Sequence, residues 1–244
     1  MSQHLNTPEG MQPLGQEETF TFSCHSSLAC FTECCRMLDL ALTPYDVLRL
    51  RRGTGLTSTQ LLEQYIIEEQ EVAEPFPRYY LTMVDDGRAS CVFVSPQGCT
   101  VYPHRPSPCR AYPLARGIRR ISSNHHQEHH VIIKEPHCLG FSESVEQNVE
   151  RYSRDQQLNE YNRMNDKMTD ILQHEAIRQG FIPSEKQIAF FRLALYDLDR
   201  FRDHLAAGKF LDVPGAPENQ VELEDEDLLL AGMKMVQNLL FSTF

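Results

Sequence analysis

From Ser142 onward, hydrophobic residues recur at three- and four-residue steps, which is the period of an amphipathic α-helix. The stretches with this period are 145–152, 158–172, 184–205 and 228–241. Gly180 and Gly208 follow two of these stretches, and Pro183-Ser184 precedes the third, as helix stop and start signals. Acidic residues before the last stretch suit the positive end of a helix dipole. The pattern therefore predicts a helical C-terminal region.

Start signals of two short helices lie nearer the N-terminus. Thr43-Pro44 places threonine at an N-cap and proline at the first helical position, and apolar residues extend this helix to Arg52. Thr57 opens the next helix, with Gln60 three residues later as in a capping box. No helix rich in base-reading side chains follows. We therefore expect a plain helical hairpin rather than a DNA-binding helix-turn-helix.

A further helix is expected from about Leu28 to Leu40, where hydrophobic residues again recur with the helical period. This helix would place Cys30 and Cys34 on one face, one turn apart. Just before it, Phe20 and Phe22 alternate with polar residues, which is the pattern of a short strand.

From 72 to 141, proline and glycine become frequent and the apolar runs are short. Such runs are typical of short strands and irregular segments. We therefore expect a mainly α fold with a small, irregular, β-containing, cysteine-rich metal lobe, which is an α+β class. The expected division is a flexible leader at 1–20, a cysteine-cluster metal-binding domain at 21–141, and a helical C-terminal region at 142–244 packed on it.

The composition is that of an ordinary soluble globular protein, with 41% hydrophobic and 23% charged residues among 244. The formal net charge of −11 argues against non-specific binding to nucleic acid or to anionic membranes, because both would repel the chain. No run of about 18 apolar residues indicates a membrane span, and the first twenty residues do not have the pattern of a secretory signal. We therefore expect a cytoplasmic protein with no nucleic-acid and no membrane partner.

Cysteine is the residue type that carries the candidate chemistry. The eight cysteines are Cys24, Cys30, Cys34 and Cys35, then Cys91, Cys99 and Cys109, and finally Cys138. A cytoplasmic chain keeps its thiols reduced, which favours metal ligation over disulfides. We expect the first two groups to meet in space around iron or zinc, with Cys138 standing alone beyond them.

The spacing of the cysteines indicates a metal but does not select one. The run C-x5-C-x3-C-C matches neither the zinc-finger and zinc-ribbon spacings nor the ferredoxin spacing. Adjacent Cys34 and Cys35 would diverge by about 100° on a helix. One of them could therefore ligate while the other packs in the core, bridges, or serves a second metal. More than four candidate thiolates favour a cluster, or two sites, over one tetrahedral zinc.

Other polar residues near the cysteines have two interpretations each. Arg105 and Arg110 could balance the negative charge of a cluster, or form ordinary salt bridges. His25 and His137 are adjacent to cysteines and are secondary ligand candidates. The run H-H-Q-E-H-H at 125–130 has no short spacing to a cysteine, so a solvated loop is the favoured interpretation.

The first cysteine group is followed by the runs L-T-P-Y-D-V-L-R-L, C-V-F-V and G-C-T-V-Y-P-H-R-P-S-P-C-R-A-Y-P-L. Through that group and these runs, the chain resembles the YkgJ-type cysteine-cluster family over about residues 22–140. That family is named for a C-x2-C-x2-C-C signature and is described as chelating zinc or iron. The gaps between the first cysteines are five and three here, where the signature has two and two. The resemblance implies that the signature positions are Cys24, Cys30, Cys34 and Cys35, and that later family positions are Cys91, Cys99, Cys109 and Cys138.

Three expectations about function follow. The first is a cytosolic metal-binding protein whose thiolates hold an iron–sulfur cluster, expected as [4Fe–4S], or an iron or zinc ion. The second is a lysine N-methylase-like transferase with a cluster-supported active site, because the family also resembles part of flagellin lysine N-methylases. The third is an adaptor that binds a protein partner and uses the metal as a staple. The sequence leaves open whether the protein is an enzyme.

Overall fold

The computed structural model describes residues 10–122, 125–210, 212–216 and 223–242. The chain forms two compact units, each assembled from separate stretches of sequence. Unit 1 consists of Met1–Leu38, Met83–Thr100 and Ser107–Glu160. Unit 2 consists of Asp39–Thr82, Val101–Pro106 and Tyr161–Phe244. This division is not contiguous along the chain, unlike the regions 1–20, 21–141 and 142–244 expected from the sequence.

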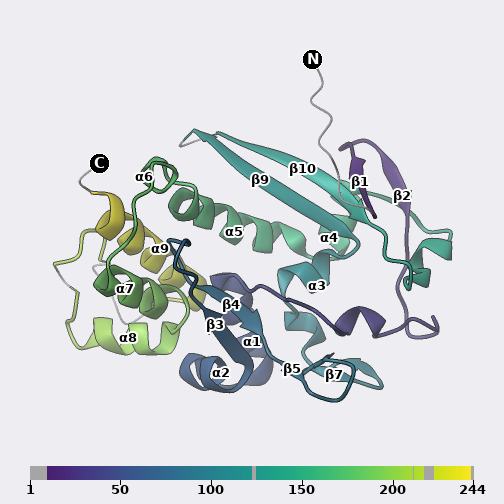
Figure 1. Cartoon of the computed structure of the whole chain (residues 1–244), viewed down its shortest axis with the longest axis horizontal. Helices are drawn as coiled ribbons and strands as arrows, with labels where there is room; N and C mark the ends of the chain where they lie inside the picture. Colours follow the sequence, from purple (N-terminus) through teal and green to yellow (C-terminus); the bar gives the residue numbers. More distant parts are fainter. Residues whose placement is uncertain (1–9, 123–124, 211, 217–222, 243–244) are drawn as a thin grey trace. The chain divides into compact units, whose positions relative to one another are not determined.

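Unit 1 contains small antiparallel sheets and short helices. One sheet has the strand order β1-β10-β9, and combines β1 (Met11–Leu14) with the hairpin of β9 (Leu114–Ser122) and β10 (His125–Ile133) (Figure 1). Other strands form pairs: β2 (Thr19–Thr21) with β11 (Glu146–Asn148), β5 (Met83–Val84) with β6 (Ser90–Cys91), and β7 (Val94–Ser95) with β8 (Gly98–Cys99). The helices are η1 (Glu33–Cys35), α3 (Ser107–Ala111), η3 (Leu139–Ser142) and α4 (Val149–Asp155).

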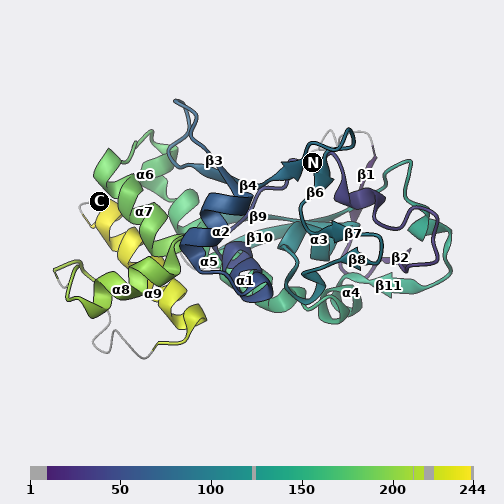
Figure 2. The ribbon, with the colours of Figure 1, turned by 90° about the horizontal axis from the view of Figure 1, so that it is seen from below.

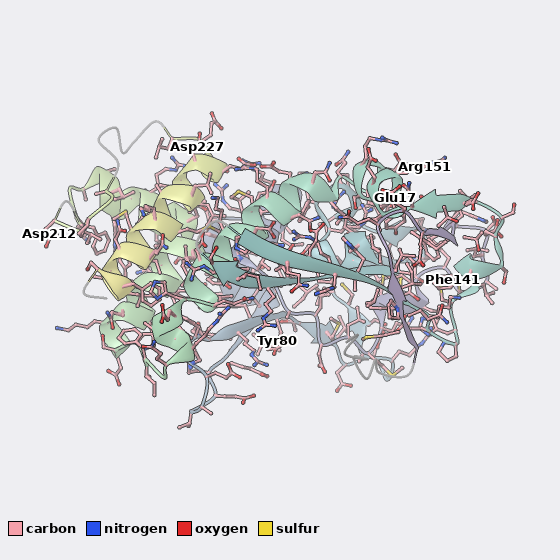
Figure 3. The ribbon with its side chains drawn as sticks, turned by 90° about the horizontal axis from the view of Figure 1, so that it is seen from above. Glu17, Tyr80, Phe141, Arg151, Asp212 and Asp227 are labelled. Atoms are coloured by element: carbon pink, nitrogen blue, oxygen red, sulfur yellow. The ribbon has the colours of Figure 1, made fainter. Side chains whose placement is uncertain are left out.

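Aromatic and aliphatic side chains form the core of unit 1. Its buried members are Phe22, Leu114, Ile132, Tyr152 and Leu158. The centroid of the Phe22 ring lies 5.2 Å from that of Phe141, which is labelled in Figure 3, and 6.1 Å from that of Tyr112. Cys138 packs against the same cluster. One of the candidate ligands is therefore anchored directly on the hydrophobic core.

Unit 2 is mainly helical. Helices α7 (Glu185–Leu195), α8 (Leu198–Ala206) and α9 (Asp225–Phe241) lie together (Figure 2). The further elements are α1 (Pro44–Thr54), α2 (Ser58–Tyr65), β3 (Ile66–Glu69), β4 (Arg78–Leu81), η2 (Tyr102–His104) and α6 (Glu175–Arg178). Helix α5 (Leu158–Leu172) begins in unit 1 and continues into unit 2. Helices α7 and α9 approach closely, because a Cβ on Gly232 would lie 2.5 Å from the Ala194 carbonyl oxygen.

Local signals in the sequence account for several helix starts. Thr43 caps α1 and Thr57 caps α2, as the sequence predicts, and Thr57 does so through the expected capping box with Gln60. Thr43 also forms a capping box, with Asp46, which was not predicted from the sequence. The first turn of α9 is acidic, where the helix dipole favours negative charge, and Asp227 marks this turn in Figure 3. These expectations are confirmed.

The helix expected from Leu28 to Leu40 is wrong. Only the single 3₁₀ turn η1 forms there, because Thr32 and Met37 on either side of it have φ angles of 70° and 51°. Such angles lie in the left-handed region and interrupt a right-handed helix. After η1 the chain is extended, and Arg36 forms a β-bridge with Ser90.

Two further expectations are corrected. The single helix predicted over 184–205 is divided into α7 and α8. At the break the Tyr196 ring stacks on Tyr79, with centroids 3.7 Å apart, and the Asp197 carboxylate accepts hydrogen bonds from α2. The run H-H-Q-E-H-H is not a loop, because it lies in strand β10. Its pairing with β9 overrides the polar composition, which on its own favours a loop.

Helices make up 43% and strands 20% of the structure, so the α+β class is confirmed. The finer expectation of a separate cysteine-rich metal lobe stays a prediction. Strand β1 lies within the leader expected at 1–20, and residues 1–9 of that leader lie outside the described residues. Among the residues that the structure describes, no helix is long and apolar enough to cross a membrane.

Candidate metal centre

All the cysteines lie in unit 1, although they come from separate parts of the sequence. Each is a free thiol. Those with exposed side chains are Cys24, Cys34 and Cys109, and the remaining five are half-buried. Reduced thiols gathered in one unit are the arrangement that metal ligation requires, since the thiolate is the metal-binding form of cysteine.

Cys35 and Cys91 are brought together by backbone pairing. Arg36 and Ser90 form an antiparallel β-bridge, so the residues before and after them, Cys35 and Cys91, occupy facing positions. Met37 reinforces the pairing, because its backbone N–H donates to the Ala89 carbonyl at 2.9 Å. The first cysteine run thus lies directly beside the start of the second.

Cys91 and Cys99 lie at the ends of a tight hairpin. The β7–β8 pair places Val94 opposite Cys99. The Thr100 backbone N–H donates to the Phe93 carbonyl at 2.9 Å and closes the loop. The Phe93 backbone N–H donates in turn to the Cys91 sulfur at 3.5 Å. Backbone N–H groups directed at sulfur stabilise thiolates and tune metal–sulfur centres.

A second set of backbone contacts joins Cys24 and Cys30 to the segment that carries Cys138. The Leu139 backbone N–H donates to the Cys30 sulfur at 3.2 Å. One residue before Cys24, the Ser23 backbone N–H donates to the Gly140 carbonyl at 3.0 Å. Cysteines more than a hundred residues apart in sequence are therefore held at neighbouring positions.

Only glycine fits at position 140. A Cβ there would lie 2.6 Å from Cε2 of Phe22 and 2.9 Å from the Ser23 carbonyl oxygen, both closer than real Cβ contacts. The absence of a side chain lets the 138–140 segment lie against the strand that leads to Cys24. The sequence shows C-L-G, but periodicity and spacing alone do not reveal this close approach.

The thiols of Cys34 and Cys35 influence each other strongly. A hydrogen bond from the Cys35 thiol lowers the pKa of Cys34 to about 7, although burial and the charge of Glu135 oppose this shift. The same hydrogen bond raises the pKa of Cys35, as do burial and the charges of Cys34, Cys109 and Cys91. Cys34 is therefore the more readily ionised thiol of the pair. Burial also raises the pKa of Cys91.

Tyr112 is a neighbour of the site that sequence reasoning missed. Its hydroxyl is buried and has no hydrogen-bond partner within the described residues. Burial raises the pKa of Tyr112, and the adjacent Cys138 thiol and Glu135 carboxyl raise it further. A buried hydroxyl without a partner is costly, and a metal-bound thiolate beside it is a natural acceptor. The Tyr112 hydroxyl thus fits a centre that includes Cys138.

Backbone strain is concentrated around the cysteines. Thr32, Met37 and Ala89 have φ angles of 70°, 51° and 46°, a region that favours glycine. Thr32 and Met37 flank η1, which carries Cys34 and Cys35, and Ala89 lies two residues before Cys91. Strain of this kind costs about 1–3 kcal/mol per residue and is common at functional sites.

Other predicted site residues have local partners. Arg110 in α3 donates through Nη1 to the Gln156 carbonyl at 2.7 Å. Arg105, in unit 2, donates through Nη1 to the Tyr102 carbonyl at 2.8 Å, with its guanidinium 3.9 Å from the centroid of the Tyr102 ring. His25 and His137 lie 3.5 Å and 3.6 Å from the carboxylates of Glu143 and Glu135. A direct role of these side chains at a metal stays a prediction.

The donors suit zinc or iron in kind and number, but they do not form a finished single-ion site. Within the described residues, no three His, Cys, Asp or Glu side chains are grouped closely enough to hold one metal ion. Tetrahedral zinc requires four donors at about 2.0–2.3 Å from one atom. In a [4Fe–4S] cluster each thiolate binds a different iron, so the sulfurs stand farther apart than around one ion. The fit therefore rests on the thiol chemistry, the N–H···S bonds and the Tyr112 hydroxyl.

The comparison with known families adds an independent observation. Residues 23–139 match a family model, CxxCxxCC, described as a putative zinc- or iron-chelating domain. The resemblance to the CxxCxxCC family is confirmed. The match spans the whole region from the residue before Cys24 to the residue after Cys138. No curated protein and no solved structure matches the chain.

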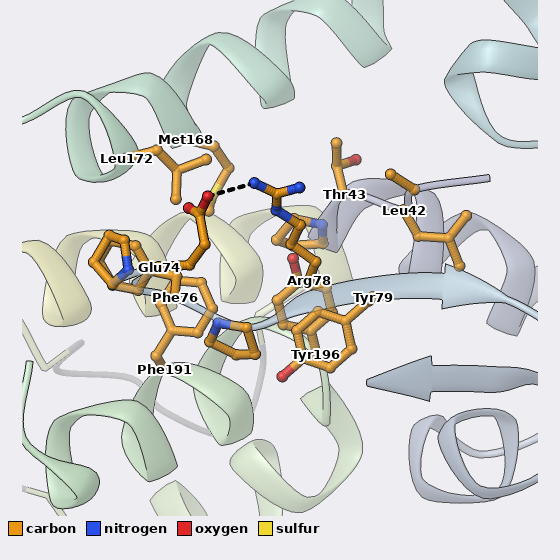
Figure 4. A pocket seen from close by; sticks show the side chains of 14 residues that line it. Leu42, Thr43, Glu74, Phe76, Arg78, Tyr79, Met168, Leu172, Phe191 and Tyr196 are labelled. Atoms are coloured by element: carbon orange, nitrogen blue, oxygen red, sulfur yellow. Dashed lines mark hydrogen bonds and ion pairs between the residues drawn. The ribbon is translucent and has the colours of Figure 1, made fainter. Parts of the chain in front are cut away.

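A separate hollow of about 280 Å³ lies in unit 2 (Figure 4). Phe76 and Phe191, whose ring centroids are 4.8 Å apart, line it together with the stacked Tyr79 and Tyr196. At its edge, the Glu74 carboxylate lies 2.7 Å from Nη2 of Arg78. Its described lining includes no cysteine. It therefore does not support a cluster-supported enzyme pocket, and that alternative stays a prediction.

Proposed function

We propose that this protein binds zinc or iron through the thiolates of unit 1. The observation that carries the proposal is the gathering of distant cysteines by backbone contacts, above all the Leu139 N–H bond to the Cys30 sulfur and the bridge that sets Cys35 opposite Cys91. The match to a zinc- or iron-chelating family supports the same chemistry.

The proposed ligands are the eight cysteines that the sequence singles out. They provide soft sulfur donors, which select zinc, copper(I) and iron–sulfur clusters over hard cations. When bound, a zinc ion would supply a structural crosslink, and an iron–sulfur cluster would supply electron transfer or metal handling. In either case the surrounding residues direct backbone N–H groups at sulfur and keep the Tyr112 hydroxyl beside Cys138.

An iron–sulfur cluster, expected as [4Fe–4S], is our first choice of metal group. Soft sulfur donors in this number suit a cluster, and the backbone N–H groups directed at Cys30 and Cys91 are of the kind that tune such clusters. Zinc is the second choice. A cytoplasmic setting belongs to the proposal too, because reduced thiols persist there.

Metal analysis of protein purified without oxygen tests the proposal. We expect either iron with acid-labile sulfide and absorbance near 400 nm, or zinc without colour, in stoichiometric amounts. The matched variant is Cys91→Ser, compared with Met37→Ser, which changes an exposed residue close to η1 without removing a thiol. Reduced metal in the first variant and full metal in the second support the proposal. Wild-type protein that folds but retains and takes up neither metal contradicts it.

A further inference from the structure

The loop between Cys99 and Cys109 carries a proposed metal ligand at each end, but its middle belongs to the other unit. Both thiols lie in unit 1, whereas Val101–Pro106 lies in unit 2. We name Val101–Pro106 the docked segment. Thr100 alone separates it from Cys99, and Ser107-Pro108 separates it from Cys109. Whatever holds the docked segment therefore limits where the two thiols can lie.

Helix α1 supplies one anchor of the docked segment. Nη2 of Arg49 donates to the Pro103 carbonyl at 3.3 Å, while Nη1 of the same side chain donates to the Tyr45 hydroxyl at 3.3 Å. Farther along α1, a Cβ on Gly53 would lie 2.8 Å from the Cβ of His104, so only glycine allows η2 to come this close. A charged donor and a glycine thus hold η2 directly against α1.

Helix α5 supplies the second anchor. Tyr161 is fully buried, and its hydroxyl donates to the Arg105 carbonyl at 3.1 Å. The centroid of its ring lies 4.9 Å from that of Tyr45 and 5.2 Å from the guanidinium of Arg49. The two anchors therefore contact each other and form one packed cluster within unit 2.

The docked segment is itself stiff. Pro103 and Pro106 lie within it and Pro108 follows it, and proline fixes its own φ angle. The His104 backbone N–H donates to the carbonyl of the buried Val101 at 2.8 Å. Fixing the middle of a short, stiff loop restricts both of its ends. Ligands that are ordered before a metal arrives lose less conformational entropy when it binds.

We infer that Arg49 and Tyr161 are positioning residues for the proposed metal centre. Neither is a ligand: they hold the docked segment, which in turn restrains Cys99 and Cys109 through the chain. Removal of groups that orient metal ligands typically lowers metal affinity by about 10–100-fold. The inference rests on the proposed function, because it concerns two of the same thiols, and it adds residues of unit 2 to a site whose thiols all lie in unit 1.

Tyr161→Phe is the sharpest variant, because it removes one hydroxyl and keeps the buried ring. After loading with metal in the absence of oxygen, excess chelator (EDTA for zinc, bathophenanthroline disulfonate for iron) should strip this variant about tenfold faster than wild type. Tyr196→Phe is the matched control and should lose metal at the wild-type rate. Tyr196 is also a buried tyrosine of unit 2, but its ring stacks on Tyr79.

Arg49→Met tests the anchor on α1 in the same way and should also accelerate metal loss. Arg52→Met is its matched control, because the Arg52 guanidinium lies on the same helix and donates to Glu226 at 2.6 Å. The control should lose metal at the wild-type rate.

A measurement on metal-free protein separates positioning from a merely structural role. Iodoacetamide should alkylate the half-buried Cys99 several-fold faster in Tyr161→Phe than in wild type. Cys30 is also half-buried but lies outside this loop, so its rate should not change. Peptide mass spectrometry reads the two sites separately. A variant that only weakens unit 2 would leave both rates at their wild-type values.

Faster metal loss together with selective alkylation of Cys99 supports the inference. Wild-type behaviour of Tyr161→Phe in either measurement overturns it and leaves the proposed function intact. Equal acceleration at Cys30 and Cys99 also overturns it, because that result indicates general unfolding. A wild type that neither retains nor takes up metal overturns the proposed function and this inference with it. If Arg49→Met fails to fold, Tyr161→Phe decides alone.

Discussion

Single residues around the cysteines hold backbone conformations that the metal-free fold tolerates at a cost. Thr32 is the clearest case, because it is β-branched and has a φ angle of 70° directly before η1. Glycine adopts this conformation without steric penalty. Because glycine would remove this strain, a Thr32→Gly variant tests whether position 32 holds a left-handed conformation.

We predict that Thr32→Gly raises the free energy of unfolding of the metal-free protein by about 1 kcal/mol. Thr32→Ser is the matched control, since it keeps a Cβ and should give no comparable gain. Urea unfolding of both variants measures the effect. A Thr32→Gly protein less stable than wild type would show that position 32 does not hold the left-handed conformation.

A second residue-scale prediction concerns Gly140. Gly140→Ala should lower the free energy of unfolding by about 1–3 kcal/mol, because its Cβ would overlap Phe22 and the Ser23 carbonyl. It should also lower metal content by displacing Cys138 from Cys24 and Cys30. Gly117→Ala is the control, as the nearest atom to its Cβ would lie 3.9 Å away. Unchanged stability and metal content in Gly140→Ala would refute the close packing of this segment.

At the scale of elements, the sequence predicted where α1 and α2 begin, but it did not predict the break between α7 and α8. Thr43 and Thr57 predict the starts of α1 and α2, because helix capping depends only on a few consecutive residues. The break between α7 and α8 depends instead on Tyr79 and on side chains of α2, which are distant in sequence. Hydrophobic periodicity runs through that break and could not reveal it.

Asp199 connects several elements of unit 2. Its carboxylate accepts hydrogen bonds from Nη2 and Nε of Arg51 at 2.6 and 2.8 Å, and from the Ser58 backbone N–H at 2.7 Å. Burial disfavours its charge, but the hydrogen bonds from Arg51 and Ser58 outweigh burial and lower the pKa of Asp199. The ionised carboxylate therefore stabilises the junction of α1, α2 and α8.

We predict that Asp199→Asn lowers the free energy of unfolding by about 2 kcal/mol at pH 7. A lowered folded pKa means that the contribution is complete above about pH 4, the unfolded value. It is lost as the pH falls through the folded pKa. Urea unfolding should therefore show the gap between wild type and variant narrowing below about pH 4. Asp203→Asn, exposed on the same helix, is the control, and a gap that widens on acidification would contradict the assignment.

As with the break between α7 and α8, the parts of the candidate site that depend on contacts between distant segments could not be predicted from sequence. Cysteine content and spacing were enough to propose candidate ligands, because thiolate chemistry is a property of residue type. The pairing that sets Cys35 opposite Cys91, and the close approach at Gly140, were not predictable, since both depend on contacts between distant segments. The expected helix over Leu28–Leu40 failed there because Thr32 and Met37 adopt left-handed conformations.

At the scale of the whole molecule, the cysteines belong to one compact unit and the helices α7–α9 to the other. Metal removal should therefore act unequally on the two. We predict that chelation increases hydrogen exchange at the backbone amides of Phe93 and Leu139, which donate to sulfur, and leaves α7–α9 protected. Equal loss of protection in both units, or no change in unit 1, would contradict a metal held by these thiols.

X-ray absorption spectroscopy at the metal edge tests thiolate ligation most directly, because it reports the atoms bound to the metal in the intact protein. The proposed function predicts a first shell of about four sulfur atoms per metal at about 2.3 Å, with iron neighbours as well if the centre is a cluster. A first shell dominated by nitrogen or oxygen at about 2.0–2.1 Å would show that the cysteines are not the ligands.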